Sequence, residues 1–348
     1  MNWLTGLGLA CLPGSVVGFI AYLRSQKMVQ DLSIIPSYKA NQLQNLLETT
    51  FRRNQSNLAQ ISGKIVCSHP LTAEFSRQPC VYHKSEITWE YDLVECYRKY
   101  LDSDGNVTRS QRIDKSTYDH DRRTSSRRNP YSYSRGMADK EQVSFQKKKS
   151  NIHSAASELV NYVTQETYYD SETGERFLLE RETSRKTETA YSIVRQVPFF
   201  VADETGKVKV DPTKAEIEPT LALEAEVSPG QSSSALSLDL SRRRFSGGGD
   251  RETVSFTYKE WIIPTDATVF VMGEVNFEQA DPVIRKPISG GRLLISLKSA
   301  AALLEEHRLN ANTYLTGSLF MLGVGIVTLI HWLESLRSRS PSGSYQGY

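Results

Sequence analysis

The sequence predicts a mainly β (α+β) soluble domain flanked by two transmembrane helices, and two observations lead to that fold class. Two runs of 21 residues without Asp, Glu, Lys or Arg lie near the ends of the 348-residue chain. Between them, short stretches of β-branched and aromatic residues alternate with turn sequences. Lys plus Arg number 42 and Asp plus Glu 40, so net charge by itself favours no class of partner.

Each of the two apolar runs is long enough to cross a bilayer. One begins at Trp3 and ends at Leu23, and the other begins at Thr313 and ends at Leu333. At about 1.5 Å per residue, such helices span a hydrocarbon core of roughly 30 Å. The first run has no basic segment before it and no small-residue cleavage site after it, so an uncleaved anchor is predicted in residues 1–30. The second anchor is predicted in residues 299–335, where an Ala- and Leu-rich helix runs into the membrane, followed by a polar tail at 336–348.

Two spans would make the chain a two-pass integral membrane protein with both termini on the same side. More basic residues flank the runs on the domain side than on the tail side, which favours a cytoplasmic domain. Gly14 and Gly18 have the small-xxx-small spacing that lets helices approach closely. This spacing indicates a contact with the second anchor or, in a homo-oligomer, with another copy of the chain. The alternative is that glycine is simply common in membrane helices.

A linker with an amphipathic helix is predicted at residues 31–60. Leu43, Leu46, Leu47 and Phe51 fall at helical spacing, which predicts a helix over residues 38–56. Such an apolar stripe packs on the core of its own domain more often than it lies on a membrane surface. Packing is therefore the favoured interpretation.

The β-rich domain is expected to occupy residues 61–298. The sequence Asp203-Glu204-Thr205-Gly206 predicts a tight turn, with glycine where a positive φ is needed. The predicted strands are residues 65–67, 80–82, 87–97, 159–169, 175–183, 190–201, 207–210, 220–227, 253–263 and 269–277.

Two insertions at residues 102–151 and 228–250 are predicted to be disordered. They hold few aliphatic residues, so they cannot bury enough apolar surface to offset the entropy of ordering. The first insertion is basic, with tyrosines between the basic residues. A solvated loop without a fixed partner is the favoured interpretation, contact with anionic lipid headgroups is the second, and nucleic acid is the least favoured.

No motif in the sequence predicts catalysis. Five residues could in principle ligate a metal: Cys67, His69, Cys80, His83 and Cys96. No C-x-x-C pair is present, so buried thiols and surface histidines are favoured over a metal site, and no cofactor is expected. A nucleophile elbow and a phosphate-binding loop are absent from the sequence. Carboxylates such as Glu260 and Glu274 are too numerous to pair by inspection, so no catalytic residue is assigned.

The β-rich domain also contains an ordered set of short motifs. Their residues are Gly63, Pro70, Leu71, Cys80, Val81, Tyr82, Pro198, Phe199, Asp203, Gly206, Gly273 and Glu274. With the flanking apolar runs, this set resembles the GIDE domain, also called the beside-a-membrane (BAM) domain. That domain occurs in mulan-type membrane-anchored RING E3 ubiquitin ligases.

The resemblance comes with one departure. A RING binds zinc through Cys and His, and the 15 residues after Leu333 contain neither, so the sequence looks like a RING-less, bacterial-type member. The resemblance then implies a membrane-anchored module that binds an unknown membrane or soluble protein, in envelope or organelle-membrane organisation, without intrinsic catalysis. The alternative it implies is an E3 ubiquitin ligase-family protein whose RING comes from another chain. An undetected enzyme would need a deep polar pocket, so enzymatic activity stays open at this point.

Overall fold

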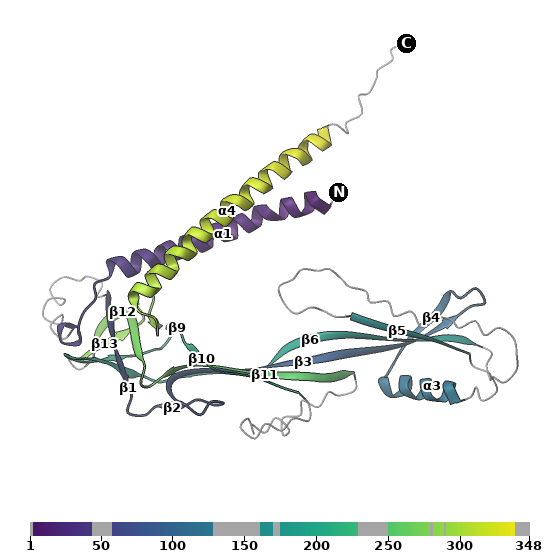
Figure 1. Ribbon diagram of the computed structural model, residues 1–348, viewed down its shortest axis with the longest axis horizontal. Coiled ribbons are helices and arrows are strands. Elements are labelled where there is room, and N and C mark those ends of the chain that lie inside the picture. Colours follow the sequence, from purple (N-terminus) through teal and green to yellow (C-terminus); the bar gives the residue numbers. More distant parts are fainter. Residues whose placement is uncertain are drawn as a thin grey trace, which may run out of the picture.

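The computed structural model describes residues 3–43, 58–127, 161–169, 175–228, 250–278, 281–288 and 290–337. Within them the chain forms three parts (Figure 1). A small β-structure, the head, carries a pair of long helices, the stalk, and a long twisted sheet, the arm. The mainly β character with accompanying helices is confirmed.

The head is a sheet whose first five strands close on themselves. The strand order is β1-β7-β8-β13-β12-β14-β9, and an additional pairing of β1 with β12 completes a small barrel. The strands are β1 (Leu58–Val66), β7 (Phe199–Asp203), β8 (Gly206–Val210), β13 (Asp281–Arg285), β12 (Thr268–Glu278), β14 (Leu294–Ser296) and β9 (Glu216–Glu218). Closure pairs every strand of the barrel on both sides, so none of them is left as an edge.

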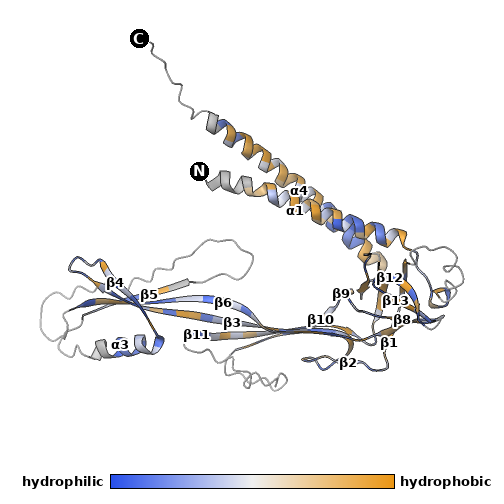
Figure 2. Ribbon diagram, turned by 180° about the vertical axis from the view of Figure 1, so that it is seen from behind, coloured by the Kyte–Doolittle hydropathy of each residue, from blue (hydrophilic) through white to orange (hydrophobic). Residues whose placement is uncertain are grey.

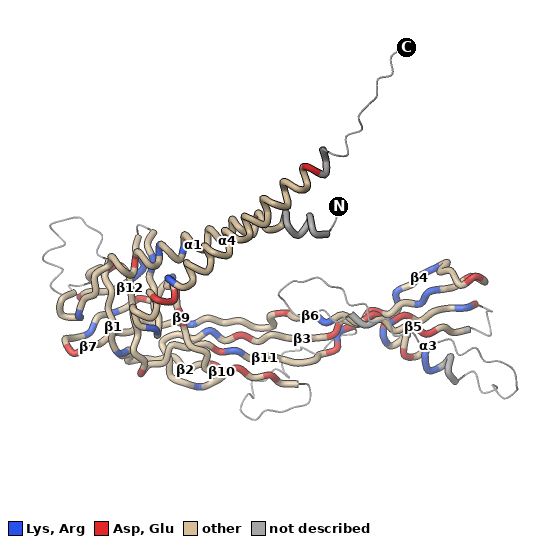
Figure 3. Tube along the Cα trace, turned by 45° about the horizontal axis from the view of Figure 1, so that its top comes forward, with Lys and Arg blue, Asp and Glu red and all other residues tan. Residues whose placement is uncertain are grey.

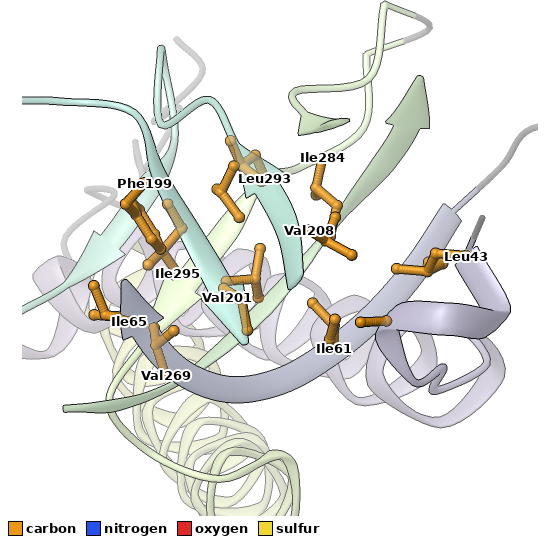
Figure 4. Close-up of a cluster of buried hydrophobic side chains, with 14 of the residues drawn as sticks. Leu43, Ile61, Ile65, Phe199, Val201, Val208, Val269, Ile284, Leu293 and Ile295 are labelled. Carbon is orange, nitrogen blue, oxygen red and sulfur yellow. The ribbon is translucent and has the colours of Figure 1, made fainter. Parts of the chain in front are cut away.

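Alternation along these strands sends one set of side chains into the barrel. Ile61, Val201, Ile284 and Ile295 are among the buried residues of this core, which Figure 4 shows in close-up. Gly63 allows β1 and β7 to lie unusually close, because a Cβ at that position would be 2.4 Å from the carbonyl oxygen of Ala202. The barrel is therefore specified by a period-2 apolar pattern and by small residues at its tightest points.

The arm is built on one unusually long strand. β3 (Pro79–Leu101) has 23 residues, which extend roughly 75 Å at about 3.3 Å per residue. β6 (Arg176–Gln196) pairs with it along almost the whole length. The sheet order is β10-β11-β3-β6-β5, with β2 and β4 also on β3. The other strands are β10 (Thr220–Val227), β11 (Arg251–Pro264), β5 (Asn161–Tyr169), β2 (Leu71–Thr72) and β4 (Val107–Ile113).

Two pairs of predicted strands turn out to be continuous. Residues 80–82 and 87–97 both belong to β3, and residues 175–183 join the first part of 190–201 in β6. The polar stretch between the latter two stays in the sheet because its backbone pairs with residues 88–93 of β3. β7 begins after Pro198, which supplies no backbone N–H to a ladder.

The stalk consists of α1 (Trp3–Ile34) and α4 (Ala300–Arg337), which run in opposite directions (Figure 1). A Cβ at Gly18 would lie 3.1 Å from Cβ of Ser318, and one at Gly14 would lie 3.1 Å from Sδ of Met321. Both glycines therefore face α4. Of the two contacts predicted for this spacing, the structure has the one with the second helix.

The base of the stalk is packed onto the outside of the head. Met28 and Leu32 of α1 and Leu303 of α4 form a buried cluster with Phe270, Met272 and Leu294 of β12 and β14. The end of α1 is also capped, because the side-chain amide of Gln60 donates a hydrogen bond to the carbonyl oxygen of Leu32 at 3.0 Å. Stalk and head therefore share one packed interface.

The structure supports one of the two predicted membrane spans. Among the described residues, one helical segment, Ala300–Glu334, is long and apolar enough to cross a membrane, and little of it is buried. This supports membrane association through the C-terminal span. The span beginning at Trp3 stays a prediction.

The first insertion differs from the prediction of disorder. Residues 107–127 form β4 and α3 (Lys115–Arg127). α3 is held by Tyr118, which is buried against Val94, Cys96 and Leu179. One aromatic anchor therefore orders a segment whose composition alone argues against a core. Residues 128–160 and 229–249, which contain residues 128–151 of the first insertion and nearly all of the second, lie outside the described part of the chain.

The linker prediction is tested over only part of its length. Residues 40–43 are helical, and Ala40 and Leu43 are buried in the barrel core. This agrees with packing on the chain's own domain. Leu46, Leu47 and Phe51 lie outside the described residues.

Candidate functional site

Four residues of the ordered motif set shape the barrel. Val81 and Phe199 are buried in its core, and Gly63 sits at the closest approach of two strands. A Cβ at Gly273 would lie 2.7 Å from Cδ1 of Leu293 and 2.9 Å from Cγ2 of Ile284. These positions are explained by packing rather than by binding chemistry.

Asp203 connects the turn after β7 to the segment that follows the stalk. Its Oδ1 accepts hydrogen bonds from the backbone N–H of Thr205 and Gly206, at 2.7 and 3.1 Å. Its Oδ2 accepts one from the backbone N–H of Ala40, at 2.8 Å. The carboxylate thus caps the short helix at residues 40–43 and closes its own turn. The prediction of a positive φ at Gly206 is wrong, because Gly206 is already the first residue of the extended strand β8.

Five further motif residues lie where head and arm meet. Leu71 pairs with Cys80 between β2 and β3, and both pack with Ile262. Tyr82 contacts the barrel core. Pro198 accepts a weak bond from the Cys67 thiol, and Pro70 precedes β2.

The five candidate metal ligands do not converge. Cys67 contacts the Pro198 carbonyl, His69 contacts the neighbouring Ser68, and Cys96 belongs to the distal cluster under α3. Burial raises the pKa of Cys80 to about 11 and also raises the pKa of Cys96, so both thiols are protonated at neutral pH. Within the described ranges, no group of three or more His, Cys, Asp or Glu side chains could hold a metal ion.

The structure instead assembles a buried polar centre around Glu260. This residue of β11 is fully buried. Its Oε1 accepts the N–H of Phe75 at 2.9 Å and the hydroxyl of Ser85 at 2.7 Å, and its Oε2 accepts the N–H of Ser76 at 2.7 Å. The carboxylate therefore fastens the turn of the β2–β3 hairpin onto the face of the arm.

Hydrogen bonding keeps Glu260 ionised despite its burial. Burial raises the pKa of this carboxyl, but the donors from Ser76, Phe75 and Ser85 outweigh burial and hold the pKa below its usual value near 4.5. The nearby His83 is also buried, and desolvation lowers its pKa despite the opposing field of Glu260. The centre thus holds one anionic carboxylate and one neutral imidazole at neutral pH.

The order of these groups rules out a nucleophilic role for Ser85. Its hydroxyl donates to Glu260, so the contact of 3.1 Å with His83 Nδ1 requires the imidazole to be the donor. A nucleophilic serine needs the reverse, with histidine accepting the hydroxyl proton. The centre is a structural clamp.

Sequence reasoning did not single out this centre. Glu260 was one of many carboxylates, and Ser85 and Phe75 are separated from it by 175 and 185 positions. No local spacing signals such a long-range network. The pairing of β3 with β11 brings Ser85 beside Glu260, and the β2–β3 hairpin brings Phe75.

Most of the exposed large apolar side chains in the described part of the chain lie on the stalk. Val16, Val17 and Phe19 of α1 and Phe320 and Val327 of α4 are exposed on its outside. Figure 2 shows this apolar character along the part of the stalk away from the head. Exposed apolar residues on both helices are typical of a surface that meets lipid.

The arm carries a different surface. Ion pairs lie along it, including Lys99–Glu180 at 2.5 Å, Arg185–Asp92 at 3.0 Å and Lys259–Glu224 at 2.8 Å. Basic and acidic residues alternate over its length in Figure 3. The arm is therefore suited to a wet, polar environment.

Comparison with known proteins gives one match. Residues 165–330 match the family model GIDE, described as E3 ubiquitin ligase. The match runs from β5 to α4 and includes the motif residues from Pro198 to Glu274. No curated protein and no solved structure matches the chain. The resemblance to GIDE is thus confirmed over residues 165–330.

Proposed function

We propose, from the match of residues 165–330 to the GIDE family, that the chain is a membrane-anchored binding protein without catalysis of its own. The stalk crosses the membrane twice, and the arm presents a polar surface to a membrane or soluble protein partner. This activity fits a role in organising an envelope or organelle membrane.

One observation carries the proposal. The two helices pack through Gly14 and Gly18, their outer faces expose apolar side chains, and their bases share a buried cluster with the head. A hairpin with apolar outer faces is stable in lipid and poorly suited to water. The docked base then fixes the head next to the bilayer.

The binding role is supported by the chemistry of the buried centre. Glu260 has its acceptors filled by chain donors, and Ser85 is oriented away from nucleophilic action. A long paired sheet with exposed polar side chains offers surface for recognition instead. Anionic lipid contact by residues 102–151 belongs to the same proposal.

Photo-crosslinking in native membranes tests the binding role. A photoreactive residue is placed at Thr189, exposed on β6 of the arm, and separately at Asp266, in an exposed turn of the head, as the matched control. The proposal predicts a discrete crosslinked product from Thr189 and none from Asp266. Equal, diffuse labelling from both positions would contradict a binding surface on the arm.

The second candidate is ubiquitin transfer, which the description of the matched family favours. In this version the chain presents a substrate to a RING on another chain. It is tested by incubating the purified full chain with ubiquitin and its activating and conjugating enzymes, with and without a separate RING protein. Ubiquitin conjugates formed without the added RING would overturn the non-catalytic proposal, and conjugates formed only with it would favour the second candidate.

A further inference from the structure

Five large apolar side chains outside the stalk are exposed among the described residues. Three of them are Val194 of β6 at 54%, Leu221 of β10 at 47%, and Ile288 in the turn after β13 at 84%; the other two, Val66 and Val107, are terminal residues of β1 and β4. Val194 and Leu221 lie in one row across the arm: Leu221 pairs with Trp261, Trp261 pairs with Lys84, and Lys84 pairs with Val194. We call Leu221, Trp261, Lys84 and Val194 the proximal row.

The side of the arm that carries the proximal row follows from strand alternation. Ser85 and Glu260, the next pair along β3 and β11, point to the face covered by the β2–β3 hairpin. Lys84 and Trp261 therefore point to the opposite face. In Figures 1, 2 and 3 the β2 hairpin lies on the side of the arm away from the stalk. The proximal row thus faces the stalk.

Ile288 lies on the same side of the molecule by an independent argument. Phe270 and Met272 of β12 contact the base of the stalk, and Glu274 is the next residue on that face of the strand. Glu274 accepts the backbone N–H of Ile288 at 3.0 Å, which holds this turn beside the stalk base. Lys286 on the same turn is exposed.

We propose that the proximal row and the Ile288 turn form a lipid-contacting surface that rests on the bilayer crossed by the stalk. The inference builds on the proposed membrane anchor. Stalk and arm leave the head towards the same side of the molecule, so a membrane crossed by the stalk faces this surface of the arm (Figure 1). The surface is continuous with the stalk, because β9, which precedes Leu221, pairs with β14, which leads into α4.

The residue types fit the water–hydrocarbon boundary. Trp prefers this interface because its ring is apolar and its N–H can stay hydrated, and Lys extends an apolar stem towards a charged headgroup. Here Nζ of Lys84 lies 4.9 Å from the ring centroid of Trp261. Within the row Lys84 pairs with Glu86, and the ion pair Lys259–Glu224 borders it, so its apolar part is narrow and suits shallow insertion.

The test uses the full chain in vesicles of phosphatidylcholine and phosphatidylglycerol, with acyl chains brominated near the headgroup. Bromine quenches tryptophan only at contact range, and the emission of Trp261 is obtained as wild type minus Trp261→Phe. We expect most of this difference signal to be lost in brominated vesicles. Trp89→Phe is the matched control, since Trp89 lies on the hairpin-covered face. In a chain that lacks Trp89, the bromine quenching of Trp261 emission should be unchanged.

Three outcomes would overturn the inference, and they are distinguishable. If the protein floats with the vesicles but Trp261 is unquenched by bromine and accessible to aqueous iodide, the membrane anchor is supported and this surface faces water. If Trp261 is shielded from iodide yet unquenched by bromine, a second copy covers the row. If the protein does not float with the vesicles, the anchor itself fails, and the proposed function fails with it.

Discussion

At the scale of single residues, stability at the junction of head and arm depends on one buried carboxylate. Glu260 receives three donors from a hairpin and a neighbouring strand, and it is the point at which the β2–β3 turn is fixed. Each of these bonds joins segments that are far apart in the chain. The charge is tolerated in the interior because its acceptors are satisfied.

Replacing Glu260 by Gln should destabilise the protein by about 1–3 kcal/mol, because the amide loses charge-assisted bonds and brings an NH₂ group against existing donors. Glu224→Gln is the control, since its ion pair with Lys259 is partly exposed and such pairs contribute little. Denaturant unfolding of the detergent-solubilised chain measures both. A Glu260→Gln variant as stable as Glu224→Gln would show that the clamp has no energetic role.

The same centre makes stability depend on pH. The pKa of Glu260 and the pKa of His83 are both lower in the folded state than their ordinary values of 4.5 and 6.5. The unfolded chain therefore binds more protons, and stability falls as pH drops, first below 6.5 through His83 and then below 4.5 through Glu260. Unfolding curves between pH 7.5 and 3.5 test this expectation. His83→Gln should remove the upper part of the decline and leave the lower part.

At the scale of elements, small residues determine how the stalk packs. Gly14 and Gly18 of α1 lie at the contact with α4 and allow the helices to approach closely. On α4, a Cβ at Gly325 would lie 2.5 Å from Cδ2 of Leu12. Gly317 of α4 differs, since a Cβ there meets nothing within 4 Å among the described residues. Substitution of a glycine at the helix contact can therefore be compared with substitution of Gly317, which is away from it.

Gly18→Val should push the helices apart and lower the unfolding temperature of the reconstituted protein by several degrees. Gly317→Val should leave it nearly unchanged, because both substitutions alter helix propensity similarly but only the first creates a clash. Thermal unfolding in lipid nanodiscs measures the shift. Equal shifts for the two variants would mean that the close contact does not stabilise the stalk.

At the scale of the whole molecule, the stalk and the head are coupled mechanically. The cluster of Met28, Leu32 and Leu303 against β12 and β14 packs the stalk directly on the head. The orientation of the arm is therefore set by the stalk. An arrangement of this kind suits a protein whose binding surface must stay at a fixed height above a membrane.

Two spans predict that both termini lie on one side of the membrane and the arm on the other. Tags at the two ends should be protected from protease together in sealed vesicles in which the domain is cleaved, with detergent-opened vesicles as the control. The flanking basic residues favour the cytoplasmic face for the domain. Protection of only one tag would show a single span.

The sequence by itself determined the features that depend on local pattern. Apolar runs indicated the positions of α1 and α4, and β-branched stretches with turn residues located β5, β8, β10, β11 and β12 within a few residues of their observed bounds. The same pattern gave only parts of β1, β3 and β6, and it did not indicate β2, β4, β9, β13 or β14. The spacing of Gly14 and Gly18 indicated a helix contact and left its partner open. These features are readable because helix and strand periods are fixed by backbone geometry.

Only the tertiary structure decided which distant segments meet. Three features require pairing across long separations in the chain. They are the closure of the barrel through β1 and β12, the uninterrupted length of β3 and β6, and the clamp at Glu260. Tyr118 orders α3 because it packs against buried side chains of β3 and β6, and the composition of the segment does not reveal that contact. Local pattern gives each segment its type, whereas long-range packing selects which surfaces are buried and which are left to meet the membrane.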